Sequence, residues 1–281
     1  MYLYIRKRMS PTIFNSKFYK QEIEIYMDKE LKQRIQSLAS KYETKDFLPA
    51  DPSSFMHKVD GAANREATAF LASCLSYGSR KQFFPKIQFI VDAANGEVDH
   101  WVRSGEWRSD IPDTAACYYR LYTFHDMHCL IAAYEKMLGE WGSMKAFVAG
   151  KAREGVDSAN SMSVTAIEAV AALCDFFAKN GAGKVVPKNT TSACKRVCMF
   201  LRWMVRTGSP VDLGLWADII DRRSLIMPLD THVVQEACKM GLLSSRTASM
   251  ATARRLTDAM LEVFPDDPLK GDFALFGLGV E

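Results

Sequence analysis

The chain has 281 residues, 48% of them hydrophobic and 25% charged. This ordinary globular balance excludes a disordered chain and suffices for a full core without disulfide or metal staples. Because 36 Lys and Arg face 33 Asp and Glu, the net charge is only +3, so a uniformly basic coat is excluded, whereas a local basic face is not. Charges or glycines interrupt the apolar runs well before about 18 residues, so no segment is expected to span a membrane.

Residues 1–27 begin with the basic stretch MYLYIRKRMSPTIF, and no apolar core follows it. We therefore expect an extension outside the fold rather than a signal peptide. From residue 28 onward the spacing of apolar residues is helical: in DKELKQRIQSLASKYE, for example, Leu31, Ile35 and Leu38 fall on one face. The same pattern predicts helices over residues 64–78, 80–96, 126–138, 161–181, 191–206, 231–240 and 244–264.

A last helix is predicted after Asp267-Pro268, a pair typical of the N-cap and first position of a helix. Alternating runs typical of strands are few and short. The sequence therefore predicts an all-α fold of roughly ten helices. The segment 179–192, KNGAGKVVPKNTTS, differs in composition from the apolar helices around it. We expect one helical domain over 28–281, with lobes at 64–180 and 181–281, a cleft between them, and 28–60 crossing back to the second lobe.

The seven cysteines are scattered, odd in number and free of CxxC pairs. This pattern is typical of buried free thiols in a reducing compartment, so we expect a cytoplasmic protein with no metal and no cofactor.

Basic residues gather in one part of the chain. Between residues 184 and 223 there are eight Lys and Arg and only three Asp, a local excess of +5. On the helix predicted from Thr191, a 100° step puts Lys195, Arg202 and Arg206 on one side. Such a strip is either a solvated helix face or a surface that contacts phosphates, and composition does not decide between the two.

Lys195 and Asp230 are the candidate catalytic residues. Lys195 is expected in the first turn of its helix, where the positive end of the helix dipole favours a neutral amine, and a neutral amine can attack carbon and form a Schiff base. Asp230 is expected at the start of a later helix, where a carboxylate can accept a proton or stabilise a cationic transition state. Taken singly, the two are also compatible with a surface lysine and a plain N-cap.

Three segments resemble one known superfamily. PLDTHVVQEACKMGL, at 228–242, resembles the catalytic-aspartate segment of the helix-hairpin-helix DNA glycosylases, and CKRVCMFLRWMVR, at 194–206, is similar to the helix that carries their Schiff-base lysine. DFALFGLGV, at 272–280, is similar to their closing helix. The resemblance covers about residues 184–280. It is closest to an uncharacterised bacterial family of this superfamily, with the archaeal 8-oxoguanine DNA glycosylases as nearest functional relatives.

The resemblance implies a monomeric base-excision repair enzyme that binds double-stranded DNA and flips a damaged base, such as the oxidised purine 8-oxoguanine, into its cleft. In this comparison Lys195 is the Schiff-base lysine, with AP-lyase activity, and Asp230 is its partner. The residues expected to contact DNA are Lys188, Asn189, Thr190, Thr191, Arg196, Arg202 and Arg206. The residues expected to form the base pocket are Tyr77, Phe200, Trp203, Trp216 and Asp272.

The chain also departs from the superfamily pattern. VVPKNTTSACKR stands in place of the usual Leu-Pro-Gly-Val-Gly hairpin turn. No cysteine quartet lies near the C-terminus, so the iron–sulfur cluster of the endonuclease III branch is not expected.

Two alternatives remain open. A protein of the same shape without chemistry would bind nucleic acid through the basic strip alone. YTFHDMHCL places His125, Asp126 and His128 together, as in metal-dependent phosphohydrolases, with His57 and Asp175 as further candidate ligands. The simpler interpretation is that Asp126 caps the helix that follows it.

Overall fold

The computed structural model describes residues 27–154 and 164–281. Within them helices dominate, and the strands are β1 (Cys117–Tyr119) and β2 (Tyr122–Thr123), which pair antiparallel as a short hairpin. The all-α prediction is confirmed at this level. The predicted extension over 1–27 lies outside the described residues except for Met27, which is buried in the core.

The helices follow one another with short connections. In chain order, the α-helices are α1 Lys29–Tyr42, α2 Ala62–Leu75, α3 Arg80–Ala93, α4 Val98–Ser104, α5 Trp107–Asp110, α6 Phe124–Trp141, α7 Met144–Glu154, α8 Ala166–Lys179, α9 Lys195–Val205, α10 Thr231–Lys239, α11 Met250–Leu261 and α12 Lys270–Val280. The 3-10 helices are η1 Lys45–Ala50, η2 Pro52–His57 and η3 Arg222–Ser224.

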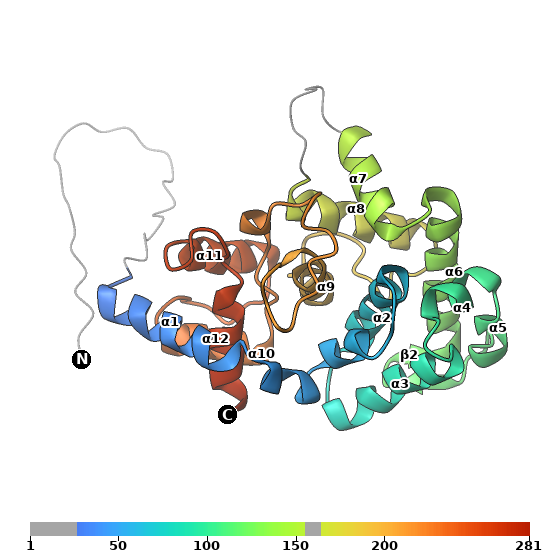
Figure 1. The fold of residues 1–281 in the computed structure, drawn as a ribbon, viewed down its shortest axis with the longest axis horizontal. Helices are drawn as coiled ribbons and strands as arrows, with labels where there is room; N and C mark the ends of the chain where they lie inside the picture. Colours follow the sequence, from blue (N-terminus) through green and yellow to red (C-terminus); the bar gives the residue numbers. More distant parts are fainter. Residues whose placement is uncertain (1–26, 155–163) are drawn as a thin grey trace, which may run out of the picture.

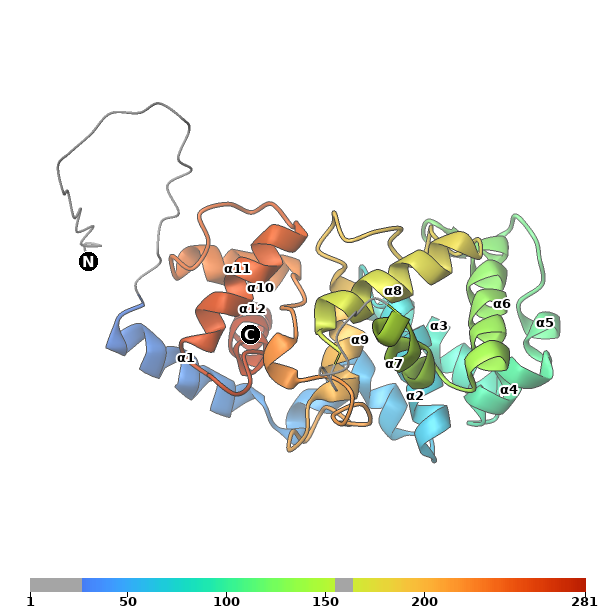
Figure 2. The same cartoon turned by 90° about the horizontal axis from the view of Figure 1, so that it is seen from above.

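The described residues form an elongated body (Figures 1 and 2). Helices α1, α10, α11 and α12 gather at one end and α3 to α6 at the other, with α2 and α9 between them. Helix α1 packs along α12, so the start and the end of the described chain lie side by side. The exact lobe boundaries at 64–180 and 181–281 stay predictions.

Side-chain caps determine where several helices begin. Thr123 and Asp126 form a capping box at the start of α6, and Thr165 and Glu168 form another at the start of α8. Each box satisfies backbone N–H groups that have no partner inside the helix. Asp126 therefore caps its helix, as the simpler interpretation of the sequence predicted.

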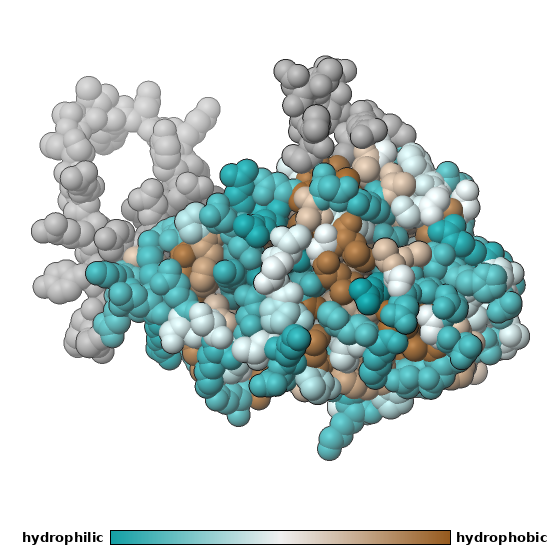
Figure 3. All heavy atoms as spheres, in the orientation of Figure 1, coloured by the Kyte–Doolittle hydropathy of each residue, from teal (hydrophilic) through white to brown (hydrophobic). Residues whose placement is uncertain are grey.

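Aromatic side chains fill the centre of the core. The ring of Phe70 on α2 stacks on Phe177 of α8 at 4.9 Å between centroids, and Tyr134 and Phe200 contact it from α6 and α9. On the face seen in Figure 3, hydrophilic residues cover most of the two ends, and hydrophobic residues show mainly between them. Among the described residues, no helix combines the length and the apolarity needed to cross a bilayer.

Several predicted helix boundaries are wrong. The helices predicted to begin at residues 191 and 244 begin at Lys195 and Met250. Helix α2 ends at Leu75, before Gly78. Helix α12 begins at Lys270, and Asp267 is not its N-cap. The Asp267 carboxylate accepts two hydrogen bonds from Arg206 instead. The side chain that the sequence pattern predicted as a helix cap therefore forms a tertiary ion pair.

Candidate active site

Lys195 and Asp230 meet at the starts of two helices. Lys195 is the first residue of α9, and Asp230 is the N-cap of α10, with Oδ1 accepting the backbone N–H of His232 at 3.0 Å. Asp230 Oδ2 lies 2.8 Å from Lys195 Nζ. The side chain of Lys195 is 29% exposed and that of Asp230 is 21% exposed. The pair is thus well shielded yet still open to a substrate.

The environment of Asp230 keeps its carboxylate charged. Burial acts to raise the pKa of Asp230, but the positive charge and hydrogen bond of Lys195 outweigh it, helped by the backbone N–H of His232, so the pKa lies below the ordinary value of 3.8. At neutral pH Asp230 is therefore an anion beside the Lys195 amine. A carboxylate at hydrogen-bond distance from an amine can accept the proton that the amine must lose before it attacks carbon.

A cavity of about 270 Å³ opens at this pair. Four aromatic rings form part of its wall, contributed by Phe47, Tyr77, Phe83 and Phe276. The volume lies just below the range for small-molecule sites, about 300–1,000 Å³. Aromatic rings beside charged and hydroxyl-bearing side chains suit a flat group that also carries polar atoms.

Polar side chains complete the cavity wall. Besides Lys195 and Asp230, it is lined by Arg80, His232 and Asp272. The Asp272 carboxyl is buried, and burial raises its pKa, whereas the adjacent Arg202 guanidinium acts in the opposite direction. Of the predicted pocket residues, Tyr77 and Asp272 therefore do line the cavity.

Three predicted pocket residues do not line it. Phe200, Trp203 and Trp216 are fully buried in the core. Phe200 packs edge-to-face on Trp216 at 5.2 Å, and Trp216 Nε1 donates to Glu66 Oε2 at 2.8 Å. The prediction that they stack on a base is wrong because α9 lies centrally, and its aromatic side chains serve the packing of α2 and the segment after α9.

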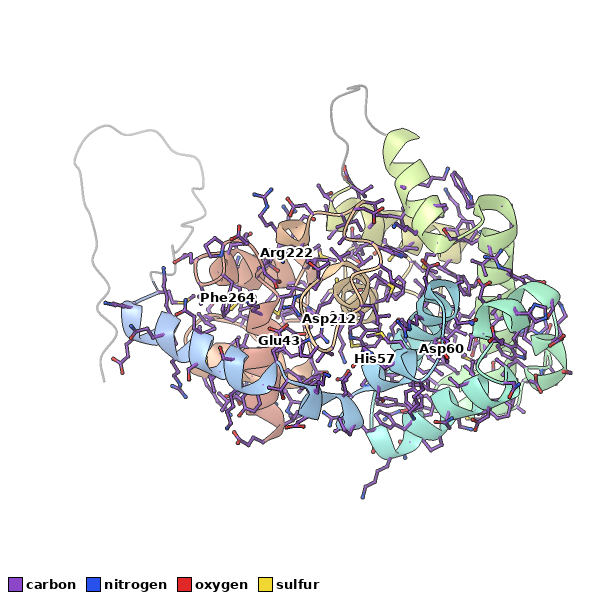
Figure 4. All side chains as sticks on the ribbon, in the orientation of Figure 1. Glu43, His57, Asp60, Asp212, Arg222 and Phe264 are labelled. Atoms are coloured by element: carbon purple, nitrogen blue, oxygen red, sulfur yellow. The ribbon has the colours of Figure 1, made fainter. Side chains whose placement is uncertain are left out.

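Arg202 and Arg206 are also buried, so neither lies on an outer surface that DNA could contact, although Arg202 lines the cavity. Arg202 Nε lies 3.3 Å from Asp212 Oδ1, and its Nη1 pairs with Asp272. Arg206 pairs with Asp212, with Asp267 at 2.9 Å, and with Glu43 at 2.7 Å. Figure 4 labels Glu43 and Asp212, which lie close together although they belong to distant parts of the chain. Internal carboxylates thus neutralise two of the three basic residues that the sequence placed on one side of the helix.

Arg196 turns toward the hairpin next to the cavity. Its guanidinium donates to Cys74 O at 2.7 Å and to Tyr122 Oη, and it lies 5.6 Å from the centre of the Tyr77 ring. Arg196 therefore holds one wall of the cavity in place rather than projecting into solvent.

The segment before α9 is the most exposed part of the predicted DNA contact. Lys188, Asn189 and Thr191 are exposed, and Thr190 is half-buried. Asn189 Oδ1 accepts from the backbone N–H and the hydroxyl of Thr191, at 3.0 and 2.6 Å. This side-chain turn shapes the loop without the glycines of the usual hairpin.

Sequence reasoning missed most of the aromatic wall. Phe47 lies in η1 and Phe276 in α12, and their rings meet edge-to-face at 6.0 Å between centroids. Phe276 stands within the DFALFGLGV segment, which was a usable signal, whereas nothing near Phe47 or Phe83 marks them as pocket residues.

The histidine cluster provides no metal site. Within residues 27–154 and 164–281, no group of three or more His, Cys, Asp or Glu side chains is placed to hold a metal ion. His125 pairs with Asp113 at 2.6 Å, and His128 bonds the carbonyl of Ile111. The remaining candidate ligands are also engaged elsewhere, namely His57 with Val211 O and Asp175 with Lys179. The phosphohydrolase alternative therefore lacks its ligand set.

A family model described as "Protein of unknown function (DUF2400)" matches residues 51–281. No curated protein and no solved structure matches the chain.

Proposed function

The match over residues 51–281 makes the chain a member of the DUF2400 family, and we propose that it is a DNA base-excision glycosylase with AP-lyase activity. The observation that carries the proposal is the contact between Lys195 Nζ and Asp230 Oδ2, 2.8 Å apart at an aromatic-lined cavity. An amine and a carboxylate in this arrangement, both at helix N-termini, have the chemistry needed for nucleophilic attack on a sugar carbon.

In the proposed reaction, the damaged base flips out of the duplex and enters the cavity. The Lys195 amine, having passed a proton to Asp230, attacks C1′ of the sugar while the bond from C1′ to the base breaks. The base leaves with that electron pair and takes up the proton that Asp230 received. The Asp230 carboxylate, charged again, faces the positive charge that develops on the sugar.

The lyase step follows from the same covalent bond. The sugar ring opens to give an imine between C1′ and Lys195 Nζ. Loss of a C2′ proton then expels the 3′ phosphate, which cuts the strand, and water releases Lys195. This sequence needs no metal and no cofactor, and it acts on double-stranded DNA.

The proposed substrate class is an oxidised purine such as 8-oxoguanine. It rests on the resemblance to the archaeal 8-oxoguanine glycosylases, and the aromatic rings in the cavity wall support it. We further propose that the exposed loop at 188–191 contacts the backbone near the flipped nucleotide, that the protein acts as a monomer and that it works in the cytoplasm. A surface lysine such as Lys188 contributes a salt-dependent term to affinity.

Borohydride trapping tests the proposal. Labelled duplexes containing 8-oxoguanine, an abasic site or neither are incubated with the protein and borohydride, which reduces the imine to a stable amine. The wild-type protein is expected to form an adduct with the first two duplexes. Lys195→Ala is expected to form none, and Asp230→Asn to form it about a hundredfold or more slowly, the usual size of a lost general base.

Lys239→Ala is the matched control. Lys239 is an exposed amine at the C-terminal end of α10, paired with Glu236 at 2.5 Å. Its replacement removes a lysine from the helix that Asp230 caps and leaves the cavity lining intact. Trapping by this variant should equal that of the wild type. An adduct that persists in Lys195→Ala contradicts the assignment of Lys195. Duplex binding without any adduct or base release contradicts the proposed enzymatic activity and indicates the non-catalytic alternative.

A further inference from the structure

Two cysteines lie next to each other directly behind the candidate lysine. Cys194 Sγ is 4.0 Å from Cys174 Sγ, and both residues are buried. Cys174 belongs to the last part of α8, and Cys194 is the N-cap of α9, the residue immediately before Lys195. All seven cysteines of the chain are free thiols, so this pair stands in its reduced form.

The backbone at Cys194 adopts an uncommon conformation. Its φ is 46° and its ψ is 37°, in the left-handed region that residues other than glycine rarely occupy. This conformation directs the chain from the preceding loop into the first turn of α9. A shift of Cys194 therefore shifts the start of the helix that carries Lys195.

Cys194 lies beneath a single exposed loop. Its sulfur is 3.3 Å from the carbonyl oxygen of Asn189 and 3.6 Å from the hydroxyl of Ser192, and both of these residues are exposed. Cys198, one turn further along α9, bonds the backbone of Ala193 and lies deeper in the core. A small oxidant thus has a shorter path to Cys194 than to Cys198.

The surroundings also favour the reactive form of Cys194. The hydrogen bond between the Cys174 and Cys194 sulfurs lowers the pKa of Cys194 to about 7 against the opposing effect of burial, and Ser192 and Arg196 act in the same direction. By contrast, burial raises the pKa of Cys74 to about 12 and raises that of Cys198 as well. The thiolate is the nucleophile in thiol oxidation, so Cys194 should react before the other buried cysteines.

We infer that Cys174 and Cys194 form a dithiol site that peroxide oxidises to a disulfide, and that this bond moves Lys195 away from its contact with Asp230. The Cys194 thiolate attacks one oxygen of hydrogen peroxide, giving a sulfenic acid and releasing hydroxide. The Cys174 sulfur then attacks the sulfenic sulfur and displaces water. In sum, the two thiols lose two protons and two electrons, and one hydrogen peroxide molecule is reduced to two water molecules.

The effect on Lys195 follows from distance. A disulfide requires about 2.05 Å between the sulfurs, whereas the thiols stand 4.0 Å apart. Cys174 is fixed within a packed helix, so the adjustment falls on the loop and the first turn of α9. This second half of the inference rests on the proposed function. A displacement of about 1 Å at a catalytic group lowers the rate on the order of a hundredfold.

The test uses the full chain carrying Cys117→Ser, Cys129→Ser and Cys238→Ser, which removes the thiols outside the core. After treatment with hydrogen peroxide, free thiols are blocked, the protein is digested without reductant, and linked peptides are identified by mass spectrometry. The expected product is a Cys174–Cys194 link that dithiothreitol reverses. The same mapping on the unsubstituted chain supports the result independently of any effect of the substitutions on folding.

Cys174→Ser and Cys198→Ser in this background are the matched variants. Cys174→Ser should give no link and should leave Cys194 as a sulfenic acid that a dimedone probe captures, whereas Cys198→Ser should form the link as before. A link between Cys194 and Cys198, or no oxidation at Cys194, overturns the dithiol site.

The effect on Lys195 is tested by imine trapping. Peroxide treatment should lower trapping tenfold or more, and dithiothreitol should restore it. Unchanged trapping by the linked form overturns the effect on Lys195. A reversible link in a protein that never traps DNA upholds the dithiol and refutes the proposed function, so the two failures are distinguishable.

Discussion

Arg206 donates from Nη2 to Oε1 of Glu43 across 2.7 Å, although 163 positions of sequence separate the two residues. Glu43 is the C-cap of α1, and Arg206 is the C-cap of α9, the helix that Lys195 begins. The same guanidinium also binds Asp267, just before α12. One buried cation thus fastens the first described helix, the central helix and the closing segment to one another, and so fixes the frame of the cavity.

Replacing this cation should destabilise the fold strongly. In Arg206→Met the side-chain volume is retained, but buried carboxylates such as Asp212 lose their counterion. We expect a loss of about 3–5 kcal/mol in the free energy of unfolding, the usual cost of removing one partner of a buried ion pair. Urea unfolding measures it. Arg223→Met removes an exposed arginine paired with Asp221 and should leave the urea midpoint unchanged. Equal midpoints for the two variants would contradict a structural role for the buried network.

Asp230 has two roles that two substitutions separate. Asparagine caps a helix about as well as aspartate, so Asp230→Asn should unfold like the wild type apart from the lost ion pair with Lys195. Asp230→Ala should lose about 1 kcal/mol more through the missing cap on the N–H of His232. Both variants should lose imine trapping equally. If trapping follows stability instead, Asp230 acts only as a cap.

The ion pair also has a defined pH dependence. The pKa of Asp230 in the folded protein lies below its ordinary value of 3.8, so the stability that the charged carboxylate provides is fully present above pH 3.8 and is lost as the pH falls through the lower, folded value. In Lys195→Met the cation is gone while burial remains, and the Asp230 pKa should rise above that of the wild type. Carbon-13 NMR of the carboxyl carbon follows both titrations. Coincident titration curves would mean that the charge of Lys195 does not affect the pKa of Asp230.

Local features of the fold could be predicted from the sequence. The apolar spacing in 166–179 and the Thr165–Glu168 capping box determine α8 almost entirely within its own residues. The N-cap role of Asp230 was likewise expected from its position before α10. These features depend on groups a few positions apart, which a single sequence displays directly.

Tertiary partners could not be predicted in this way. The basic count over 184–223 is correct, but besides Asp212, which that count includes, Arg206 is neutralised by Glu43 and Asp267, which lie outside the counted segment. Trp216 is buried because α9 and α2 enclose it, and its own neighbours in sequence do not reveal that. The pairing of Lys195 with Asp230 was expected from a resemblance to a family, because two residues 35 positions apart are related by no helical or strand periodicity.

Two of the buried tryptophans, Trp203 and Trp216, offer a matched measurement of one hydrogen bond. Trp216 Nε1 donates to Glu66, whereas Trp203 Nε1 meets no acceptor among the residues that the structure describes. Both Trp→Phe changes remove similar volume from fully buried sites. Trp216→Phe should therefore cost about 1.5–3 kcal/mol more than Trp203→Phe, the usual range for a hydrogen bond to a charged group. Both proteins should still trap DNA in proportion to their folded fraction. A loss of trapping in Trp216→Phe that exceeds the loss of folded protein would indicate that Trp216 contributes to base binding after all.

Gly277 lets α1 and α12 approach closely, and it supplies the last prediction. A Cβ at this position would overlap the ring of Tyr42, whereas a Cβ at Gly139 of α6 would meet nothing within 4 Å. Alanine favours both helices by about 0.5–1 kcal/mol over glycine, but at Gly277 the overlap should reverse the sign and cost about 1–3 kcal/mol. Because Tyr42 stands beside the Glu43 that holds Arg206, Gly277→Ala should also weaken trapping, whereas Gly139→Ala should stabilise the protein and leave trapping unchanged. Urea unfolding and the trapping rate test both expectations. If Gly277→Ala is as stable as Gly139→Ala, the contact between the two ends of the chain is looser than the packing of α1 on α12 indicates.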